Sequence, residues 1–285
     1  MASTSPKQII DSQRHDWNRV AGGWEKWDRV FDEQMAFLNH RLVADARLRP
    51  GLCVLDLGSG TGYPALLAAQ TVRPNGKVVG IDLAEQMLEA ARRKAASLKL
   101  TNVTFQTGDV TTLPFDAASF DAVISRFCLM FLPEIPKAVA EIARILRPNT
   151  WVSTAVWSAP DKNPYLKIPI DTIKQFVELP APDPTAPGIF RLAKPNELAD
   201  MLQQAGMVHI SEQEFVGDVR FAGADEYFSS LMDIAAPIQN LWEKLPPPQQ
   251  AQAKQQILQT AERYRMGTTI ALPIAVRMIA ACKPG

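Results

Sequence analysis

The chain is poor in cysteine and histidine, carries no surplus of either charge, and has no long apolar run. Its three cysteines (Cys53, Cys128 and Cys282) are too few and too far apart to predict a disulfide framework or a metal site, which favours a cytoplasmic setting. Thirty Lys and Arg balance thirty Asp and Glu. The basic stripe of a nucleic-acid binder is therefore absent, and we expect no nucleic-acid substrate. No apolar window of about 18 residues exists, so we expect no membrane span.

What is present points to one enzyme-sized domain. The 285 residues are 47% apolar, which is enough for a sizeable core, and they show no internal repeat. The first residues, 1–6, lack the apolar core of a secretory signal. We therefore expect a single domain over residues 1–285, acting as a monomer or a homodimer.

The stretch Val54–Gly62 organises the chain. An apolar run enters a turn with glycines at 58, 60 and 62, and residues 65–69 then read as a helix. Such a turn places backbone N–H groups and a helix N-terminus at the carboxyl end of a strand, where they suit an anionic or polar cofactor group. Tyr63 stands where the dinucleotide fingerprint G-x-G-x-x-G needs glycine. A plain tight strand–helix connection is the alternative.

An acidic residue ends the next predicted strand. Asp82 closes the run 77–82, about 20 residues after the glycine turn. In α/β nucleotide sites an acid at this place accepts hydrogen bonds from ribose hydroxyls. Capping the helix that begins near Ala84 is a second interpretation. The two are compatible because a carboxylate has enough lone pairs for both.

Strands and helices alternate along the middle of the chain. Apolar runs at 52–57, 77–82, 103–106, 120–125 and 150–157 alternate with helical patterns at 63–72, 84–98 and 134–146. This alternation predicts a parallel sheet covered by helices on both faces. Ligands bind such sheets beyond the carboxyl ends of the strands. The glycine turn, Asp82 and the ends of the next two strands should therefore converge on one crevice.

Five stretches together resemble a known family. Val54–Gly62, Val79–Asp82, Gly108–Leu113, Phe120–Ser125 and Ile142–Pro148 occur in the order and spacing of class I S-adenosylmethionine-dependent methyltransferases. More narrowly, they are similar to the small-molecule methyltransferases of ubiquinone and menaquinone biosynthesis. The resemblance covers about residues 50–157, and the flanks match loosely. It implies a Rossmann-like sheet of seven strands, mostly parallel with an antiparallel last strand.

The resemblance implies S-adenosyl-L-methionine as cofactor, leaving as S-adenosyl-L-homocysteine. It assigns Asp56 to the ammonium end, Asp82 to the ribose, and Asp109 to the adenine amino group. The full set of expected cofactor residues is Trp24, Trp27, Asp56, Gly58, Ser59, Gly60, Asp82, Leu83, Met87, Gly108, Asp109, Val110, Ser125 and Arg126. Leu83 and Met87 read equally well as core residues.

Candidate catalytic residues are few. Ser125 and Arg126 should line the passage between cofactor and substrate. Arg126 would there bind a carboxylate or phenolate of the substrate, or else form a surface pair with Glu134. His15 is the best candidate base because it precedes the N-terminal apolar stripe. Cys128 is a nucleophile in principle, although an apolar-flanked cysteine is more often packed.

Residues 10–48 read as helical. Apolar residues recur at three- and four-residue steps from Trp17 to Leu42, which predicts one apolar stripe. We expect Gly22-Gly23 to break or bend this helix. Within the lid segment 1–50, Trp24 and Trp27 would close over the cofactor with the glycines as a hinge. Plain packing of the helix on the core is the alternative.

The half after the core, 158–285, departs from alternation. Prolines crowd residues 158–206, among them Pro160, Pro164, Pro169, Pro180, Pro182, Pro184 and Pro187. Helices are expected at 168–177 and 196–202, and a sixth strand at 207–216. A helical cap over about 224–266 would cover a substrate pocket or pack on the core. Its candidate lining residues are Tyr227, Phe228, Met232 and Tyr264.

The final strand is expected at Ile270–Cys282. Pro273 lies within it and cannot donate a ladder hydrogen bond. We therefore expect this strand at a sheet edge, or beginning after the proline.

Methyl transfer by direct displacement needs alignment of nucleophile, methyl and sulfur more than it needs a base. The apolar cap favours a small hydrophobic or aromatic acceptor such as a phenol, a quinol or a secondary metabolite. No Asn-Pro-Pro-Tyr-type motif follows the fourth strand, which disfavours amino-directed nucleic-acid and glutamine methyltransferases. The alternatives are a nicotinamide-dependent oxidoreductase and a non-catalytic S-adenosylmethionine-binding protein.

Overall fold

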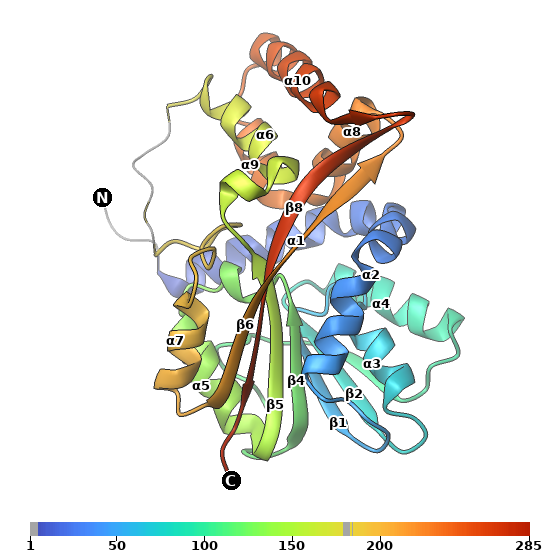
Figure 1. Ribbon diagram of the computed structural model, residues 1–285, viewed down its shortest axis with the longest axis vertical. Helices are drawn as coiled ribbons and strands as arrows, with labels where there is room; N and C mark the ends of the chain where they lie inside the picture. Colours follow the sequence, from blue (N-terminus) through green and yellow to red (C-terminus); the bar gives the residue numbers. More distant parts are fainter. Residues whose placement is uncertain (1–4, 179–182, 184) are drawn as a thin grey trace.

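The computed structural model describes residues 5–178, 183 and 185–285. Its central sheet has the strand order β3-β2-β1-β4-β5-β8-β6, with a short β7 paired to β8 (Figure 1). In sequence order these strands are β1 (Cys53–Leu57), β2 (Lys77–Asp82), β3 (Val103–Thr107), β4 (Phe120–Arg126), β5 (Leu146–Trp157), β6 (Val208–Phe221), β7 (Arg265–Met266) and β8 (Thr269–Cys282). Pro180, Pro182 and Pro184 of the predicted proline-rich loop lie outside the described residues.

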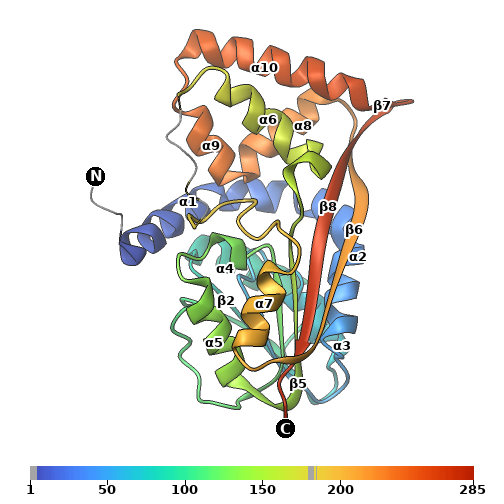
Figure 2. The same ribbon diagram turned by 60° about the vertical axis from the view of Figure 1, so that its left-hand side comes forward.

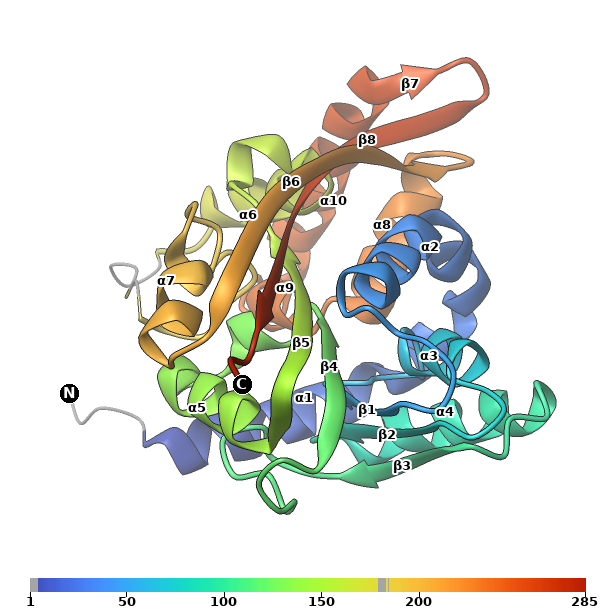
Figure 3. The ribbon, with the colours of Figure 1, turned by 60° about the horizontal axis from the view of Figure 1, so that its bottom comes forward.

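Helices cover both faces of this sheet. On one side lie α2 (Asp28–Asp45), α3 (Ala65–Thr71) and α4 (Glu85–Ser97), and on the other α5 (Ile135–Ile145) and α7 (Glu197–Gln204), as Figure 3 shows. The strands β1 to β5 pair in parallel, and β8 is antiparallel to both β5 and β6. The predicted sheet of seven long strands is therefore confirmed, with β7 added.

A helical layer stands above the carboxyl ends of the parallel strands. It consists of α6 (Pro164–Lys174), α8 (Ala224–Ile234), α9 (Ala236–Trp242) and α10 (Pro247–Ala261). Figure 2 shows α1 (Pro6–Lys26) crossing between this layer and the sheet. Short 3-10 turns complete the chain at Leu129–Phe131 (η1), Pro160–Lys162 (η2) and Glu262–Tyr264 (η3). In the part of the chain that the structure covers, no helix is both long and apolar enough to cross a membrane.

The strand β8 runs through Pro273, so the predicted edge position is wrong in part. It lies between β5 and β6, but β5 pairs with it only as far as Val276, opposite Trp157. Ala275 turns its N–H and C=O toward the β5 side, where they bond to Asn163 Oδ1 at 2.8 Å and to the Ser158 N–H at 2.9 Å. Residues two apart point the same way, so Pro273 faces the side where β5 has ended and no donor is needed.

Helix α6 begins and ends about one turn earlier than the predicted span 168–177. It contains Pro169. A proline inside a helix leaves the carbonyl four residues before it without a donor. Here that carbonyl belongs to Tyr165, and the Tyr227 hydroxyl donates to it at 2.7 Å. Tyr227 is completely buried in this role.

The glycine pair does not break the N-terminal helix, contrary to our expectation. Helix α1 continues through Gly22 and Gly23, and the chain bends at Trp27 before α2. A Cβ on Gly23 would lie 2.0 Å from the carbonyl oxygen of Asp233, whereas one on Gly22 would meet nothing within 4 Å. Gly23 therefore serves the close approach of α1 to the end of α8.

This difference predicts opposite effects of two neighbouring substitutions. Gly22→Ala should raise the free energy of unfolding by about 1 kcal/mol, because alanine favours an exposed helix position. Gly23→Ala should lower it by about 1–3 kcal/mol, because the new methyl group must push α1 away from α8. Urea unfolding followed by circular dichroism measures both. Equal effects of the two variants would contradict the packing role of Gly23.

Candidate active site

The glycine turn, Asp82 and the end of β4 meet at one pocket. Leu57 pairs with Ile81 of β2 on one side and with Ser125 of β4 on the other. The residues that follow these strand ends therefore face the same crevice. Of the expected cofactor residues, the pocket is lined by Trp24, Gly58, Ser59, Gly60, Asp82, Leu83, Met87, Gly108, Val110 and Arg126.

The glycines of the turn have different tasks. Gly58 and Gly60 both adopt positive φ, 68° and 51°. A Cβ on Gly58 would lie 2.6 Å from the sulfur of Cys128, so this glycine makes room for the chain after β4. A Cβ on Gly60 would meet nothing within 4 Å. Gly60 is thus the position at which the turn leaves open space toward the pocket.

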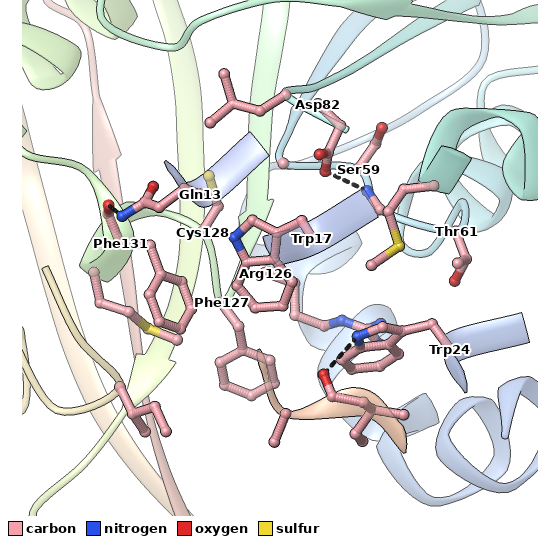
Figure 4. A pocket seen from close by; sticks show the side chains of 18 of the residues that line it. Gln13, Trp17, Trp24, Ser59, Thr61, Asp82, Arg126, Phe127, Cys128 and Phe131 are labelled. Carbon is pink, nitrogen blue, oxygen red and sulfur yellow. Dashed lines mark hydrogen bonds between the residues drawn. The ribbon is translucent and has the colours of Figure 1, made fainter. Parts of the chain in front are cut away.

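The bonds of Asp82 show the helix-capping interpretation, whereas its role toward the ribose stays a prediction. Its Oδ2 accepts the Gly60 N–H at 2.9 Å, which Figure 4 marks, and its Oδ1 accepts the Ala84 N–H at 2.9 Å. The second bond supports the start of α4. Each oxygen keeps a lone pair, so a ribose hydroxyl can still be accepted at the pocket wall.

Asp56 lies beneath the pocket without lining it. Its Oδ2 accepts the Ala65 N–H at 2.9 Å at the start of α3, whereas the buried Oδ1 has no partner among the described residues. Burial raises the pKa of this carboxyl well above its ordinary value, and the nearby Arg126 guanidinium acts in the opposite direction. The hydroxyl of Ser59 is likewise buried and unpaired in the described chain. These two unpaired oxygens, together with the open space beside Gly60, fit a polar, positively charged cofactor end.

A cluster of charged groups lies behind the turn. Lys94 of α4 pairs with Asp28 of α2, and its ammonium group lies 4.9 Å from the centre of the Tyr63 ring. Burial, followed by the charge of Asp32, raises the pKa of the Tyr63 hydroxyl to about 12. Tyr63 is therefore protonated at neutral pH and lines the pocket as a neutral phenol.

Arg126 enters the pocket from the end of β4. Its Nη1 donates to Asn39 Oδ1 at 2.8 Å, and no described carboxylate comes within 4.0 Å of its guanidinium. The predicted alternative, a surface pair with Glu134, is wrong, because Glu134 lies 3.8 Å from Lys137 instead. Burial lowers the pKa of Arg126, while Asp56 and Asp32 act against this. The side chain stays charged, as arginine does in proteins.

The far end of the pocket is apolar and largely aromatic. Phe127 stacks on Trp157 with ring centres 4.2 Å apart and planes 6° from parallel. Phe127 adopts φ of 56°, which is unusual for a bulky residue. The other walls are Phe31, Met35, Met130, Phe131, Leu132, Tyr165, Leu166, Ile189, Ile234, Ala235 and Pro237.

Helix α1 forms the roof and is fastened on both sides. Trp24 Nε1 donates to the Ile234 carbonyl at 3.1 Å, and Trp27 Nε1 donates to Asp233 Oδ2 at 2.7 Å. At the other end, Gln13 Nε2 donates to the Phe131 carbonyl at 2.6 Å, which Figure 4 marks. These three bonds hold α1 over the space between the glycine turn and the cap.

Several predicted residues do not reach the pocket. Trp27 anchors the roof, and His15 is exposed on α1. Ser125 donates to the Leu57 carbonyl at 2.9 Å and so joins β4 to β1 instead of lining a passage. Asp109 Oδ1 accepts both the N–H and the hydroxyl of Thr111, each at 2.8 Å.

The cap residues proposed from the sequence also lie elsewhere. Tyr227, Phe228, Met232 and Tyr264 pack within the apolar core around the helical layer, and Ile234, Ala235 and Pro237 face the pocket instead. Sequence reasoning also missed Tyr63, Phe127 and Trp157. All three follow or end a strand at its carboxyl end, so the strand-end rule that identified Asp82 would have found them. Phe31, Tyr165 and Ile189 carried no such signal.

Gly60 offers a test of the cofactor cradle with a matched control. Gly60→Ala should weaken S-adenosylmethionine binding at least about tenfold, because its methyl group points into the open space of the turn. Gly267→Ala makes the same change at φ of 62° in a turn outside the pocket. Both should lose about 1 kcal/mol of stability. Isothermal titration with S-adenosylmethionine measures the difference, and equal affinities in the two variants would contradict the cradle.

The buried carboxyl of Asp56 predicts a pH dependence of stability. Its pKa in the folded protein lies above the ordinary 3.8, so the folded state holds the proton more tightly. The stabilisation that this tighter proton binding gives the folded state is complete below about pH 4 and is lost as the pH rises through the raised pKa. Asp56→Asn keeps an acceptor for the Ala65 N–H and cannot ionise. We expect the variant to be more stable than wild type near neutral pH.

Urea unfolding at a series of pH values from about 4 to 8 measures the Asp56 effect. The difference in free energy of unfolding between variant and wild type should increase as the pH rises. Binding of S-adenosylmethionine should weaken in Asp56→Asn at neutral pH, because the negative charge is gone. A wild type that is the more stable protein at every pH would contradict the assignment.

Comparison with known proteins identifies the family of the chain. Residues 54–149 match the family described as "Methyltransferase domain". The chain is 31% identical to demethylmenaquinone methyltransferase of Staphylococcus aureus over 208 residues, which is 68% of this chain and 86% of that protein. It is 28% identical to nocamycin O-methyltransferase of Saccharothrix syringae over 91% of this chain and 95% of that protein.

Two further comparisons cover a smaller share of the related protein. Demethylmenaquinone methyltransferase of Symbiobacterium thermophilum is 40% identical over 130 residues, 45% of this chain, and the match spans about half (47%) of that protein. A structure of phosphoethanolamine N-methyltransferase 2 from Haemonchus contortus, solved with S-adenosylhomocysteine, shares the fold at a TM-score of 0.60 and 18% identity, covering 100% of this chain and 62% of that one. The chain therefore belongs to the class I S-adenosylmethionine-dependent methyltransferases.

Proposed function

We propose that this protein transfers a methyl group from S-adenosylmethionine to a small hydrophobic or aromatic molecule. One observation carries the proposal: a single pocket joins the glycine turn and Asp82 to the aromatic walls around Phe127 and Trp157. The cofactor end is polar, and the other end offers flat apolar surface to a ring. A ring acceptor held there would lie next to the methionine end of the cofactor.

The position of each residue in the pocket suggests which part of the cofactor it would contact. Asp82, Gly60 and Asp56 would hold the ribose and the amino-acid end of the cofactor, and Leu83 and Met87 would pack on its adenine. When bound, the cofactor supplies an electrophilic methyl group on a sulfonium. The protein's task is then to align the acceptor and exclude water, which the α1 roof and the Phe127–Trp157 wall are placed to do.

The relatives support an acceptor in this class. Demethylmenaquinone methyltransferases and nocamycin O-methyltransferase are named for a quinone and a secondary metabolite. The nicotinamide alternative has no support, since Tyr63 interrupts the dinucleotide fingerprint and the family is a different one. A non-catalytic binder would not need the apolar half of the pocket, which argues against that alternative.

We propose further that residues 1–285 act as one domain, in the cytoplasm, as a monomer or homodimer. The strands β6 and β8 run from the central sheet into the helical layer as a continuous pair, which ties the two halves of the chain together (Figure 1).

An acceptor panel tests the function. Purified protein with S-adenosylmethionine should release S-adenosylhomocysteine with some phenols, quinols or aromatic carboxylic acids, detected by mass spectrometry together with the methylated product. Parallel reactions contain RNA and unfolded protein as acceptors. Turnover on those polymers alone, or no turnover on any compound despite tight cofactor binding, would contradict the proposal.

The aromatic wall supplies a variant for the same assay. Phe127→Leu should raise the KM of a ring acceptor roughly three- to tenfold, because stacking is lost, and should leave the Kd of S-adenosylmethionine unchanged. Phe37→Leu is the matched control, since Phe37 is exposed on α2 outside the pocket. An unchanged KM in Phe127→Leu would place the acceptor elsewhere.

A further inference from the structure

The pocket has few groups that can take a proton. Among the described residues that line it, the ionisable side chains are Tyr63, Asp82, Arg126, Cys128 and Tyr165. The three histidines of the chain, His15, His40 and His209, are exposed and do not line it. Within the described part of the chain, a general base for the acceptor would therefore come from this short set.

None of the set is suited to act as a base near neutral pH. Burial raises the pKa of the Tyr63 hydroxyl to about 12, and it also raises the pKa of the Cys128 thiol and of the Tyr165 hydroxyl. These groups are protonated under such conditions. Asp82 is ionisable, but its two oxygens hold the Gly60 and Ala84 N–H groups at the opposite, cofactor end.

Arg126 is a cation facing the pocket without a close counter-ion. Asn39 is almost completely buried and accepts one of its five N–H groups, which fixes the direction of the guanidinium. Figure 4 shows the Arg126 side chain at the pocket wall with Trp17, Trp24 and Phe127. The charged and titratable groups around it are Asp56 on β1, Asp28 and Asp32 on α2, Tyr63 after the glycine turn, and Lys94 on α4.

Of the charged groups in this cluster, only Arg126 lines the pocket among the described residues, and its positive charge favours an anion there. Lys94 already pairs with Asp28, and Asp32 is engaged by Asn39 at 3.5 Å. The remaining donors of Arg126 have no protein acceptor among the described residues, and the adjoining walls are apolar. A charge-assisted hydrogen bond to an oxyanion would be strong there, because little water competes for it.

We infer that the methyl acceptor binds as an oxygen anion paired with Arg126, and that its proton is lost to solvent before binding, not to a protein base. This deepens the proposed function and rests on it. The acceptor is accordingly an oxygen acid that ionises near neutral pH, such as an acidic phenol, the enol of a 1,3-dicarbonyl, or a carboxylic acid. An amine or an alkyl alcohol does not fit.

The step then balances without a further reactant. A lone pair of the acceptor oxygen forms the new C–O bond to the methyl carbon while the C–S bond breaks and its electron pair stays on sulfur. The negative charge of the acceptor and the positive charge of the sulfonium cancel. The products are a neutral methyl ether or ester and S-adenosylhomocysteine.

The first test is a binding titration that needs no turnover. The probe is 4-nitrophenol, whose ionised form has its own visible absorption band, added to protein saturated with S-adenosylhomocysteine. Arg126 should lower the apparent pKa of the bound probe by about 1 to 2 relative to Arg126→Met, a roughly ten- to hundredfold preference for the anion. Arg126→Lys should restore part of this preference. The neutral isostere 4-nitrotoluene should bind equally to wild type and Arg126→Met.

Controls separate the anion site from cofactor binding and from folding. Arg263→Met removes an exposed arginine outside the pocket and should behave as wild type. The Kd of S-adenosylhomocysteine, measured by titration calorimetry, should be the same in Arg126→Met. If Arg126→Met instead weakens that ligand about tenfold or more and leaves the probe unaffected, Arg126 serves the cofactor carboxylate and the inference is overturned. Failure of 4-nitrophenolate to bind wild type also overturns it.

The second test concerns the proton. For any acceptors found by the panel, the rising limb of kcat/KM with pH should follow the pKa of each acceptor. A limb common to acceptors of different acidity, or one abolished by Tyr63→Phe, would reveal a protein base and overturn the inference while leaving methyl transfer intact. Absence of any turnover would instead count against the proposed function, and the probe titration would still decide the role of Arg126.

Discussion

The carboxylate of Asp82 joins the glycine turn to the end of β2, and the pocket depends on that connection. Its two bonds, to the Gly60 N–H and the Ala84 N–H, couple the first and second strand–helix units of the sheet. The positive φ angles at Gly58 and Gly60 are thereby held in place without a ligand. A change at Asp82 would disturb both the turn and the proposed ribose acceptor, so a substitution at Gly60 tests the cofactor site more cleanly.

Charge is distributed unevenly along the pocket. The acidic residues Asp56, Asp32 and Asp28 gather behind the glycine turn with Lys94 and Arg126, whereas the cap end is apolar. A buried charge is costly unless it is paired, so this cluster is favourable chiefly when charged ligand groups complete it. The cofactor carries such groups, and an anionic acceptor would supply the last one. Binding energy would thus be concentrated beside the atoms that react.

The cap and the roof share the apolar core of the sheet and are fixed by several specific contacts. The strands β6 and β8 carry the chain beyond the end of β5 into the helical layer, and Pro273 is tolerated where that extension has only one neighbour. Gly23 lets α1 approach α8 closely, and Trp24 and Trp27 bond to the end of that helix. Because these segments lie outside residues 54–149, which match the methyltransferase family, they are where acceptor choice is expected to be set.

The sequence by itself determined the sheet core and the cofactor end of the site. The glycine turn, Asp82 and Arg126 could be found because each lies at or directly after the end of a strand, and parallel strands end at one edge. Only the tertiary structure decided which glycine is open to the pocket, that Ser125 and Asp109 bond to the backbone or a neighbour instead of lining it, and that Tyr227 completes the carbonyl freed by Pro169. It also brought Phe31, Trp157 and Ile234 together. Those contacts join segments far apart in the chain. Local sequence patterns do not indicate which distant side chain packs at a given position.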